Sequence, residues 1–432
     1  MVRVSPVPSG GRLYVANARP RPRSLGALGV VLVGVFFLPV PLCAAGLTLD
    51  EVLRAVDQTA DAEVAAAMTD IARAELKEAR SQKSPNVTVD AQGDLVGDED
   101  PSQSEYVLMV EQTLLDWGRA DEAIAGRRSA MGARESGEGE ALLDAALQST
   151  EMFYGVGAVN EKLVSNQTNR EALTELRDMI QRRVESNVSP RIDLEEVKIR
   201  LDLLDIADHQ LAAEKRRQQL ALKRLTGLDV NSPVLSGCPE QRTTDEGRLV
   251  SDALSSSPTL ERIRRRAEAH SYDARALDAS GLPSLIAGYR SDSDLDGDGF
   301  DQRAYIALRY QFQAGGELEA RVAAERARYL EQQALLRKEA EVITQTVSAW
   351  VSAYQTSLAL VGVYDRIMIS KRRQKESHLR RFLAGRSSWK DVLNAQQEVA
   401  DAQISRIDSL ISACLASSSL DLLAVGGGVF GD

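Results

Sequence analysis

The feature that most constrains this chain is an internal sequence repeat. The segment "RRVESNVSPRIDLEEV" (182–197) aligns without gaps with "RRFLAGRSSWKDVLNA" (380–395), at an offset of 198 residues. The same offset pairs Pro85 with Pro283. A long repeat predicts two structural units of the same kind, which we place at 46–226 and 247–424 with a linker at 227–246 and a flexible tail at 425–432.

Each copy begins with a predicted helix, at 49–82 and 247–279, in which apolar residues recur every three or four positions. Two alternating segments follow, at 85–114 and 283–313, separated by polar loops at 93–104 and 291–303. Alternation predicts strand pairs with one apolar and one polar face. We expect the apolar face to contact lipid through Leu108, Val110, Leu114, Ile306, Leu308, Tyr310 and Phe312.

Very long helical hairpins complete the copies, at 119–226 and 316–424. Each starts after a glycine and carries a helix of about 67 residues, which spans roughly 100 Å. Short turns at 187–190 and 385–388 then reverse the chain. A helix of that length does not fit inside a compact domain, so we expect an elongated coiled-coil molecule.

Residues 1–45 have the features of a signal peptide, with arginines before an apolar run and small residues after it. An uncleaved membrane anchor and a lipoprotein acylated at Cys43 are the alternatives. Beyond this segment we see no run that is long enough to span a membrane. Cys238 and Cys414 could pair in an exported chain. The net charge of −11 argues against a nucleic-acid partner.

The stretch "SDSDLDGDGF" (291–300) resembles the opening of an EF-hand loop. Its twelfth position is Arg303, where a bidentate glutamate is required, and strands flank it instead of helices. We therefore interpret it as a hairpin loop, with weak calcium binding left open. His209, His270 and His378 are isolated in the sequence, and we predict no catalytic, cofactor-binding or metal site and no enzymatic activity.

Two strand pairs provide four strands, whereas the smallest closed barrels in membranes have eight. A barrel would have to be shared among subunits, with the helices packed into a tube on the opposite side from the polar loops. The fold class we predict is therefore mainly α with a small membrane β part, in two tandem repeats. The inferred object is an oligomeric channel.

This arrangement resembles the TolC family of outer-membrane channel proteins, through "VEQTLLDWGRADEA", "LRYQFQAGGELEARVA" and "RFLAGRSSWKDVLNAQQEVADAQ". The resemblance implies a homotrimer with a twelve-strand barrel and a helical tunnel, in the outer membrane of a Gram-negative bacterium. It also implies two partners, a periplasmic adaptor and an inner-membrane ABC or RND transporter. Export is then the function, with type I protein secretion favoured and multidrug efflux as the alternative. A periplasmic coiled-coil scaffold without a pore is the non-channel alternative.

The resemblance also implies roles for single residues. Asp391 matches an acidic ring that constricts the periplasmic tip, and the second position of that ring holds Asn394. The first copy has Asp193 and Glu196 at the same two places. Favourable charge at a helix N-terminus is the alternative reading of these acids. The tips would contact the adaptor through Asn187, Ser189, Pro190, Gly385, Arg386, Ser387 and Trp389.

Overall fold

A computed structural model describes residues 46–56, 60–92, 105–235, 245–294, 300–311 and 315–426. The expectations for the signal peptide, for Cys43 and Cys238, for Phe312 and for residues 427–432 lie outside the described residues.

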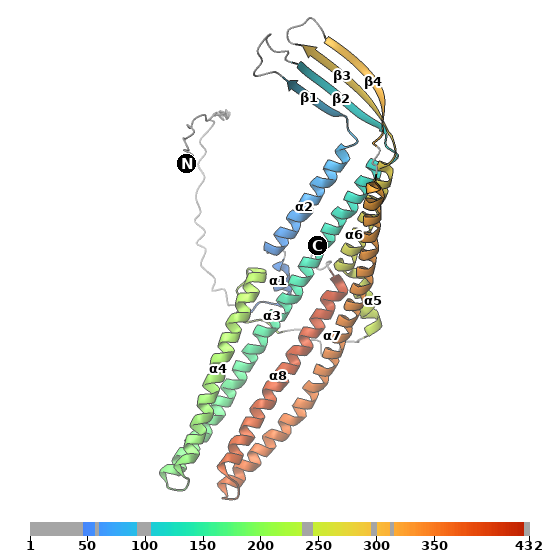
Figure 1. The fold of residues 1–432 in the computed structure, drawn as a ribbon. Helices are drawn as coiled ribbons and strands as arrows, with labels where there is room; N and C mark the ends of the chain where they lie inside the picture. The colour runs from blue at the N-terminus through green and yellow to red at the C-terminus, as the bar shows by residue number, and fades with distance from the viewer. Residues whose placement is uncertain are drawn as a thin grey trace, which may run out of the picture. The chain divides into compact units, whose positions relative to one another are not determined.

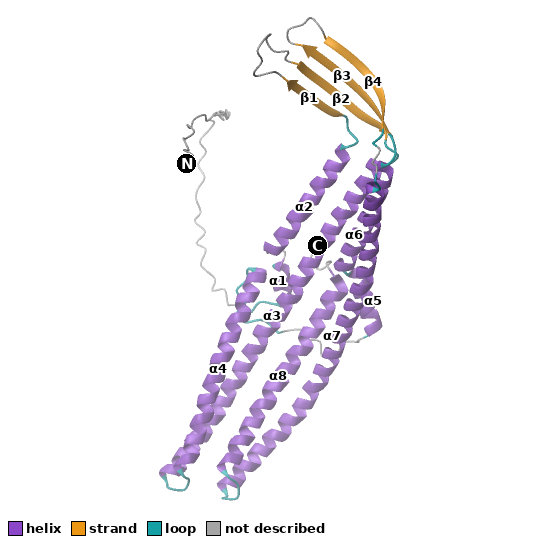
Figure 2. Cartoon of the chain, in the orientation of Figure 1, coloured by secondary structure: helices purple, strands orange, loops and turns teal. Residues whose placement is uncertain are grey.

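The described residues form long helices and one small sheet, which confirms a mainly α fold with a small β part (Figures 1 and 2). The first half of the chain contains α1 (Leu49–Arg54), α2 (Ala60–Ser81), β1 (Asn86–Gln92), β2 (Glu105–Leu115), α3 (Arg119–Glu185) and α4 (Arg191–Thr226). The second half contains α5 (Glu246–Ser256), α6 (Pro258–Ser280), β3 (Ser284–Asp294), β4 (Phe300–Arg309), α7 (Glu317–Leu383) and α8 (Trp389–Val425).

The two longest helices, α3 and α7, have 67 residues each and begin and end where the sequence predicts. Each is preceded by a glycine with positive φ, Gly118 at 84° and Gly316 at 74°. Glycine adopts this conformation without steric cost, so the chain can turn from strand into helix there. The start of α7 lies 198 residues after the start of α3, and α8 begins at the same offset from α4.

The prediction of one continuous helix at the start of each copy is wrong. The first region is divided into α1 and α2, and the second into α5 and α6. In the second copy Ser257 is extended and its side chain caps Leu260, while Pro258 occupies the first helical position. Proline disfavours helical geometry in the residue before it, so a helix ends here although the apolar period continues.

Helices α4, α3, α8 and α7 pack in that order, α3 against α4 and α8, and α8 against α7 (Figure 1). Around the middle of this layer lies a buried cluster that includes Phe153 and Tyr154 of α3 and Ile407 and Ile411 of α8. Val230, in the predicted linker, is buried in the same cluster. This part of the linker therefore packs into the core that holds the two hairpins together.

Helix α8 is long and apolar enough to cross a membrane by length and composition, which the sequence reading overlooked. Half of its most apolar stretch is buried within the chain. Ile407, Ile411 and Cys414 belong to the central cluster, and Leu420 packs with α5 and α7. The packing makes α8 the core helix of the bundle.

A second buried cluster joins the two hairpins near their turns, at the ends that lie far from the sheet (Figure 1). Trp389 is only 3% exposed, and its ring lies 5.0 Å from that of Phe382. The indole Nε1–H donates to the backbone oxygen of Asp193 at 2.9 Å, which links the second hairpin to the first. The structure therefore corrects the expectation that Trp389 offers an adaptor contact, because its side chain is buried inside the chain.

Trp389→Ala should destabilise the end of the helical layer by about 3–5 kcal/mol, because it removes a buried ring and leaves a cavity. Trp389→Phe is the matched variant, since it keeps a buried aromatic ring and removes the bond to Asp193, so its loss should be smaller. Chemical denaturation of the purified protein and limited proteolysis at the two turns would measure the loss. Equal stability of wild type and Trp389→Ala would contradict the cluster as a stabilising element.

Candidate functional site

The four strands form one antiparallel sheet in the order β1-β2-β3-β4. One face is apolar and open to the surroundings: Ile306 and Leu308 are 71% and 70% exposed. They pair with Ala287 and Leu285 on the neighbouring strand, so the apolar character continues across strands. The same face also carries Val87, Val89, Leu108, Val110 and Tyr289, with the polar Gln112 opposite Ala287. Leu114 is exposed and lies at the bulge between Thr113 and Leu115, so the register does not place it on either face.

The predicted end of the last strand is corrected by the structure. Strand β4 ends at Arg309, which pairs with Ser284, so Tyr310 follows the strand instead of lying within it. The residue before Ser284 is Pro283, which has no N–H to continue the ladder. Trp117 Nε1–H donates to the Pro283 oxygen at 2.7 Å, and its exposed ring closes this corner of the sheet.

The opposite face of the sheet carries a polar network. Tyr305 donates its hydroxyl hydrogen to Glu111 at 2.9 Å, and Arg309 contacts the same carboxylate at 3.0 Å. The Tyr305 ring lies directly over Gly288, where a Cβ would meet the ring at 2.2 Å. Glycine is therefore required on β3 for the tyrosine to reach across to β2.

The described residues of the calcium-like stretch lie in strands. β3 continues through Asp294 and β4 starts at Phe300, so the expected loop at 291–303 is much shorter. Asp292 lies 2.7 Å from Arg290 Nε and 3.4 Å from Arg303. The first carboxylate of the apparent calcium motif is thus neutralised by arginines, one of them at the position where calcium loops need glutamate. Asp296 and Asp298 lie outside the described residues.

The two hairpin turns have the same backbone geometry. Asn187 and Gly385 have positive φ values of 56° and 68°. In the first turn Val188 N–H donates to Arg183 O at 2.8 Å, and in the second Arg386 N–H donates to Arg381 O at 2.7 Å. These are Schellman motifs, which satisfy the last carbonyls of α3 and α7.

Asp391 is held by its own helix. Its carboxylate accepts from Ser388 N–H at 3.0 Å and from Ser387 Oγ at 2.9 Å. Ser388 Oγ accepts in turn from Asp391 N–H at 3.2 Å, which completes a capping box. The hydrogen bonds from Ser388 and Ser387 hold the pKa of Asp391 below its usual range.

The equivalent end of the first hairpin is built differently. Pro190 precedes α4 and provides no side-chain cap. Burial raises the pKa of Asp193, and nearby Glu196 adds to this effect while Arg183 opposes it. Arg183 also donates to Ser189 at 3.2 Å, and its guanidinium lies 5.0 Å from the Phe382 ring.

The four acidic-ring candidates do not contact one another through hydrogen bonds within the part of the chain that the structure describes. Asn394 accepts from Arg200 of α4 at 3.0 Å, a contact between the hairpins that the sequence did not indicate. Asp193 and Glu196 interact only through their charges. Asn187, Pro190, Gly385 and Arg386 are exposed at the turns, and Ser189 and Ser387 are half-buried.

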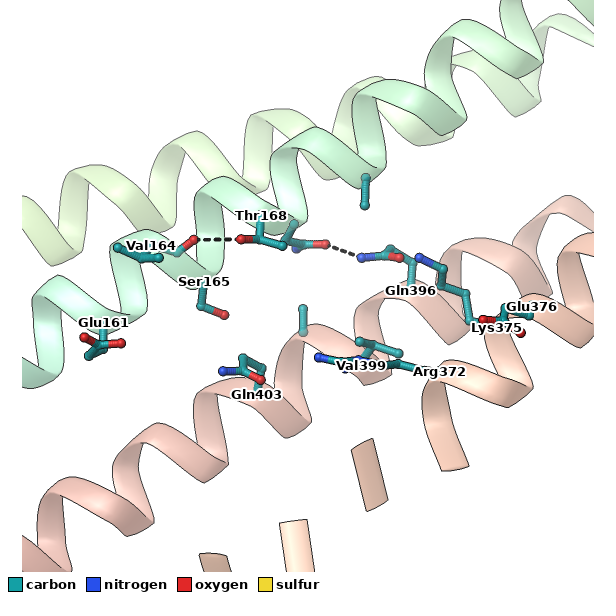
Figure 3. Close-up of a pocket in the computed structure, with 13 residues that line it drawn as sticks. Glu161, Val164, Ser165, Thr168, Arg372, Lys375, Glu376, Gln396, Val399 and Gln403 are labelled. Carbon is teal, nitrogen blue, oxygen red and sulfur yellow. Dashed lines mark hydrogen bonds between the residues drawn. The ribbon is translucent and has the colours of Figure 1, made fainter. Parts of the chain in front are cut away.

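Between the turns and the central cluster lies an open groove of about 490 Å³ between α3, α7 and α8 (Figure 3). At its wall Gln396 of α8 donates to Asn169 of α3 at 2.8 Å, and both side chains are buried. The seam between the hairpins is therefore polar here and apolar above and below. This buried pair joins helices far apart in the sequence, so no local signal could predict it.

Residues 249–424 match the family model of outer membrane efflux proteins, which confirms the resemblance drawn from the sequence motifs. No curated protein sequence matches the chain.

Solved structures agree with this fold. The outer membrane protein VceC from Vibrio cholerae has a TM-score of 0.77 at 15% identity, over 88% of this chain and 96% of its own. CusC has a TM-score of 0.78 at 13% identity, over 88% and 92%. The CmeC outer membrane channel of Campylobacter jejuni has a TM-score of 0.69 at 17% identity, over 88% and 86%.

Ser388→Ala should loosen the first turn of α8, because an N-cap serine contributes about 1 kcal/mol. Hydrogen exchange of amides 389–392 should accelerate roughly fivefold, a factor that follows from this free energy.

The pKa of Asp391 is lowered in the folded protein, so the ionised carboxylate contributes to folding stability. This contribution is present above the unfolded pKa of about 3.9 and is lost as pH falls through the folded pKa.

Asp193→Asn is the matched control for the capping experiment, because α4 has no side-chain cap at Pro190. Exchange at the start of α4 should stay unchanged in this variant. Wild-type exchange rates in Ser388→Ala would show that the capping box does not stabilise the tip.

Proposed function

We propose that the chain forms the outer-membrane exit duct of a tripartite export system, as a homotrimer with its helices in the periplasm. The observation that carries the proposal is a four-stranded sheet with an exposed apolar face, mounted on helical hairpins of 67 and about 36 residues. A face of this kind is stable against lipid, and the network of Glu111, Tyr305 and Arg309 suits a water-filled interior.

The edges of the sheet support assembly from several copies. β1 and β4 each have a neighbour on one side only within the described sheet. Backbone groups left unpaired in a bilayer cost several kcal/mol each, so the edges must pair with other strands. Pairing β4 of one copy with β1 of the next repeats around a ring, and three copies make the twelve-strand barrel that the TolC resemblance implies.

The helices have matching open sides. α4 and α7 are the outermost helices of the four-helix layer. α4 exposes an apolar stripe that its own chain leaves largely uncovered, formed by Ile192, Ile199, Leu203 and Ile206. Packing of α4 against α7 of the next copy would bury this stripe and close the ring with the same rotation as the strands.

The partners that we propose are those that the TolC resemblance implies. The tips at Asn187–Pro190 and Gly385–Ser387 are the surfaces we assign to a periplasmic adaptor, which in turn contacts an inner-membrane ABC or RND transporter. Cys414 is disulfide-bonded, which fits an oxidising compartment such as the periplasm. The pairing of Cys414 with Cys238 stays a prediction.

For the cargo we propose protein export by type I secretion, with multidrug efflux as the second candidate. The basis is the amino-acid sequence at the second tip, "AGRSSWKDVLNAQ". Deletion of the gene separates the two candidates, since loss of a large exported protein from the medium supports secretion and increased sensitivity to small toxic compounds supports efflux.

Purified protein in detergent should be trimeric by native mass spectrometry and should conduct ions in planar bilayers. A monomeric protein without conductance would exclude the channel and leave the scaffold alternative.

Ile306→Lys tests the lipid-facing assignment within the same assay, because a lysine near the bilayer midplane costs about 2–4 kcal/mol and should reduce insertion.

Asp391→Asn should lower cation selectivity and Asp391→Ala should raise conductance through the closed tip, because each removes one negative charge per subunit from the constriction we propose. Ser388→Ala separates this effect from helix capping, since it removes the cap and keeps the charge. Unchanged selectivity and conductance in both Asp391 variants would remove this residue from the gate.

A further inference from the structure

Three side chains that can bind metals meet between α6 and α7. His270 and Asp273 are one helical turn apart on α6, and Glu325 is on α7. One ligand atom from each residue lies within 4.8 Å of the other two. His270 Nδ1 is 2.8 Å from Glu325 Oε2, and all three residues are half-buried. His270 is isolated from other histidines and cysteines in the sequence, and the fold brings it against the carboxylates of Asp273 and Glu325.

Asp273 is the member of this cluster whose carboxylate has no hydrogen-bond partner among the described residues. The charges of Arg127 and Glu325 act on this carboxylate in opposite directions. The carboxylate fits against Gly126 of α3, where a Cβ would lie 2.7 Å from Asp273 Oδ1. A glycine in the middle of a helix costs about 1 kcal/mol relative to alanine, and here it makes room for the carboxylate.

The corresponding positions of the first copy, 198 residues earlier, show what the cluster lacks. They hold Ala72, Glu75 and Arg127. Glu75 and Arg127 form an ion pair at 3.7 Å, so a guanidinium neutralises the carboxylate in the first copy. In the second copy the guanidinium is replaced by the carboxylate of Glu325, and a histidine is added. Two acids and an imidazole thus occupy the place of an acid–base pair.

We propose that His270, Asp273 and Glu325 bind a divalent transition-metal ion of the Zn²⁺ type. One imidazole and two carboxylates form a ligand set that suits Zn²⁺ and similar ions better than Ca²⁺ or Mg²⁺, which prefer oxygen ligands alone. The ion would take the place of the proton shared by His270 and Glu325, and that proton would leave to solvent on binding. Binding requires each of the three ligand atoms to lie about 2.0–2.2 Å from the ion.

The surroundings already orient one of the ligands. Arg328 pairs with Glu325 Oε1 from the next turn of α7, which leaves Oε2 directed at His270. Fixing a ligand through its second oxygen is how outer contacts strengthen metal sites. A bound ion would join α6 to α7 about 12 Å from the start of α7 and so hold the sheet end of the second hairpin.

Titration calorimetry with ZnCl₂ tests the site on tag-free full-length protein that has been treated with chelator. The wild type should bind one ion per chain that His270→Gln and Asp273→Asn fail to bind. Affinity should fall more than tenfold in each variant, because loss of even an outer contact costs about 10–100-fold. His209→Gln on α4 is the matched control and should retain the ion.

Hydrogen exchange adds a readout that shows where the ion binds. Zn²⁺ should slow exchange in 266–277 and 321–329 of the wild type, and it should have no effect there in His270→Gln. Equal binding by the wild type and both ligand variants, or no stoichiometric binding by the wild type, would overturn the proposal. Neither result depends on channel activity, so the site and the export function are tested separately.

Discussion

The open edges of a four-stranded sheet with one apolar face are the constraint on which the rest of this structure depends. The sheet order β1-β2-β3-β4 joins the two halves of the chain through β2 and β3 and leaves one free edge on each half. In the membrane placement that we propose, lipid could not satisfy those edges, so only further strands could. The helices follow the sheet through Gly118 and Gly316. In the ring that we propose, the symmetry that closes the strands would therefore also set which helix faces meet.

Local signals in the sequence account for the parts that could be predicted. Glycines mark the starts of α3 and α7, and the residues that tolerate positive φ, Asn187 and Gly385, mark their ends. The break at Ser257 also had a local signal, in the proline that follows it. The apolar period continues across this break, because a change of helix axis does not interrupt the spacing of buried residues. The period alone therefore predicts one continuous helix.

The parts that could not be predicted rest on contacts between distant segments. Trp389 has the sequence context of an exposed turn, but its ring reaches Phe382 and its indole N–H reaches the carbonyl of Asp193. In the same way, Arg200 of α4 donates a hydrogen bond to Asn394 on the other hairpin. Spacing within one helix contains no information about these partners, and the repeat only shows which segments are equivalent.

Helix capping is compatible with the role at the pore that we propose for Asp391. The hydrogen bonds from Ser387 and Ser388 stabilise the ionised form of the carboxylate, so its negative charge persists at neutral and mildly acidic pH. The cap also limits the rotamers available to the side chain. A carboxylate fixed in this way would place the charge of a constricting ring more precisely than a free one.

The two copies differ at their tips and near the sheet. At the tips the second copy has the capping box of Ser388 and Asp391, whereas the first has Pro190 and a half-buried Asp193. Near the sheet the first copy has an ion pair, and the second has the His270 cluster. These differences lie at opposite ends of α7, a helix of 67 residues. A metal ion near the sheet would therefore hold α6 and α7 together at the barrel end without restricting the turns, where an exit duct has to open.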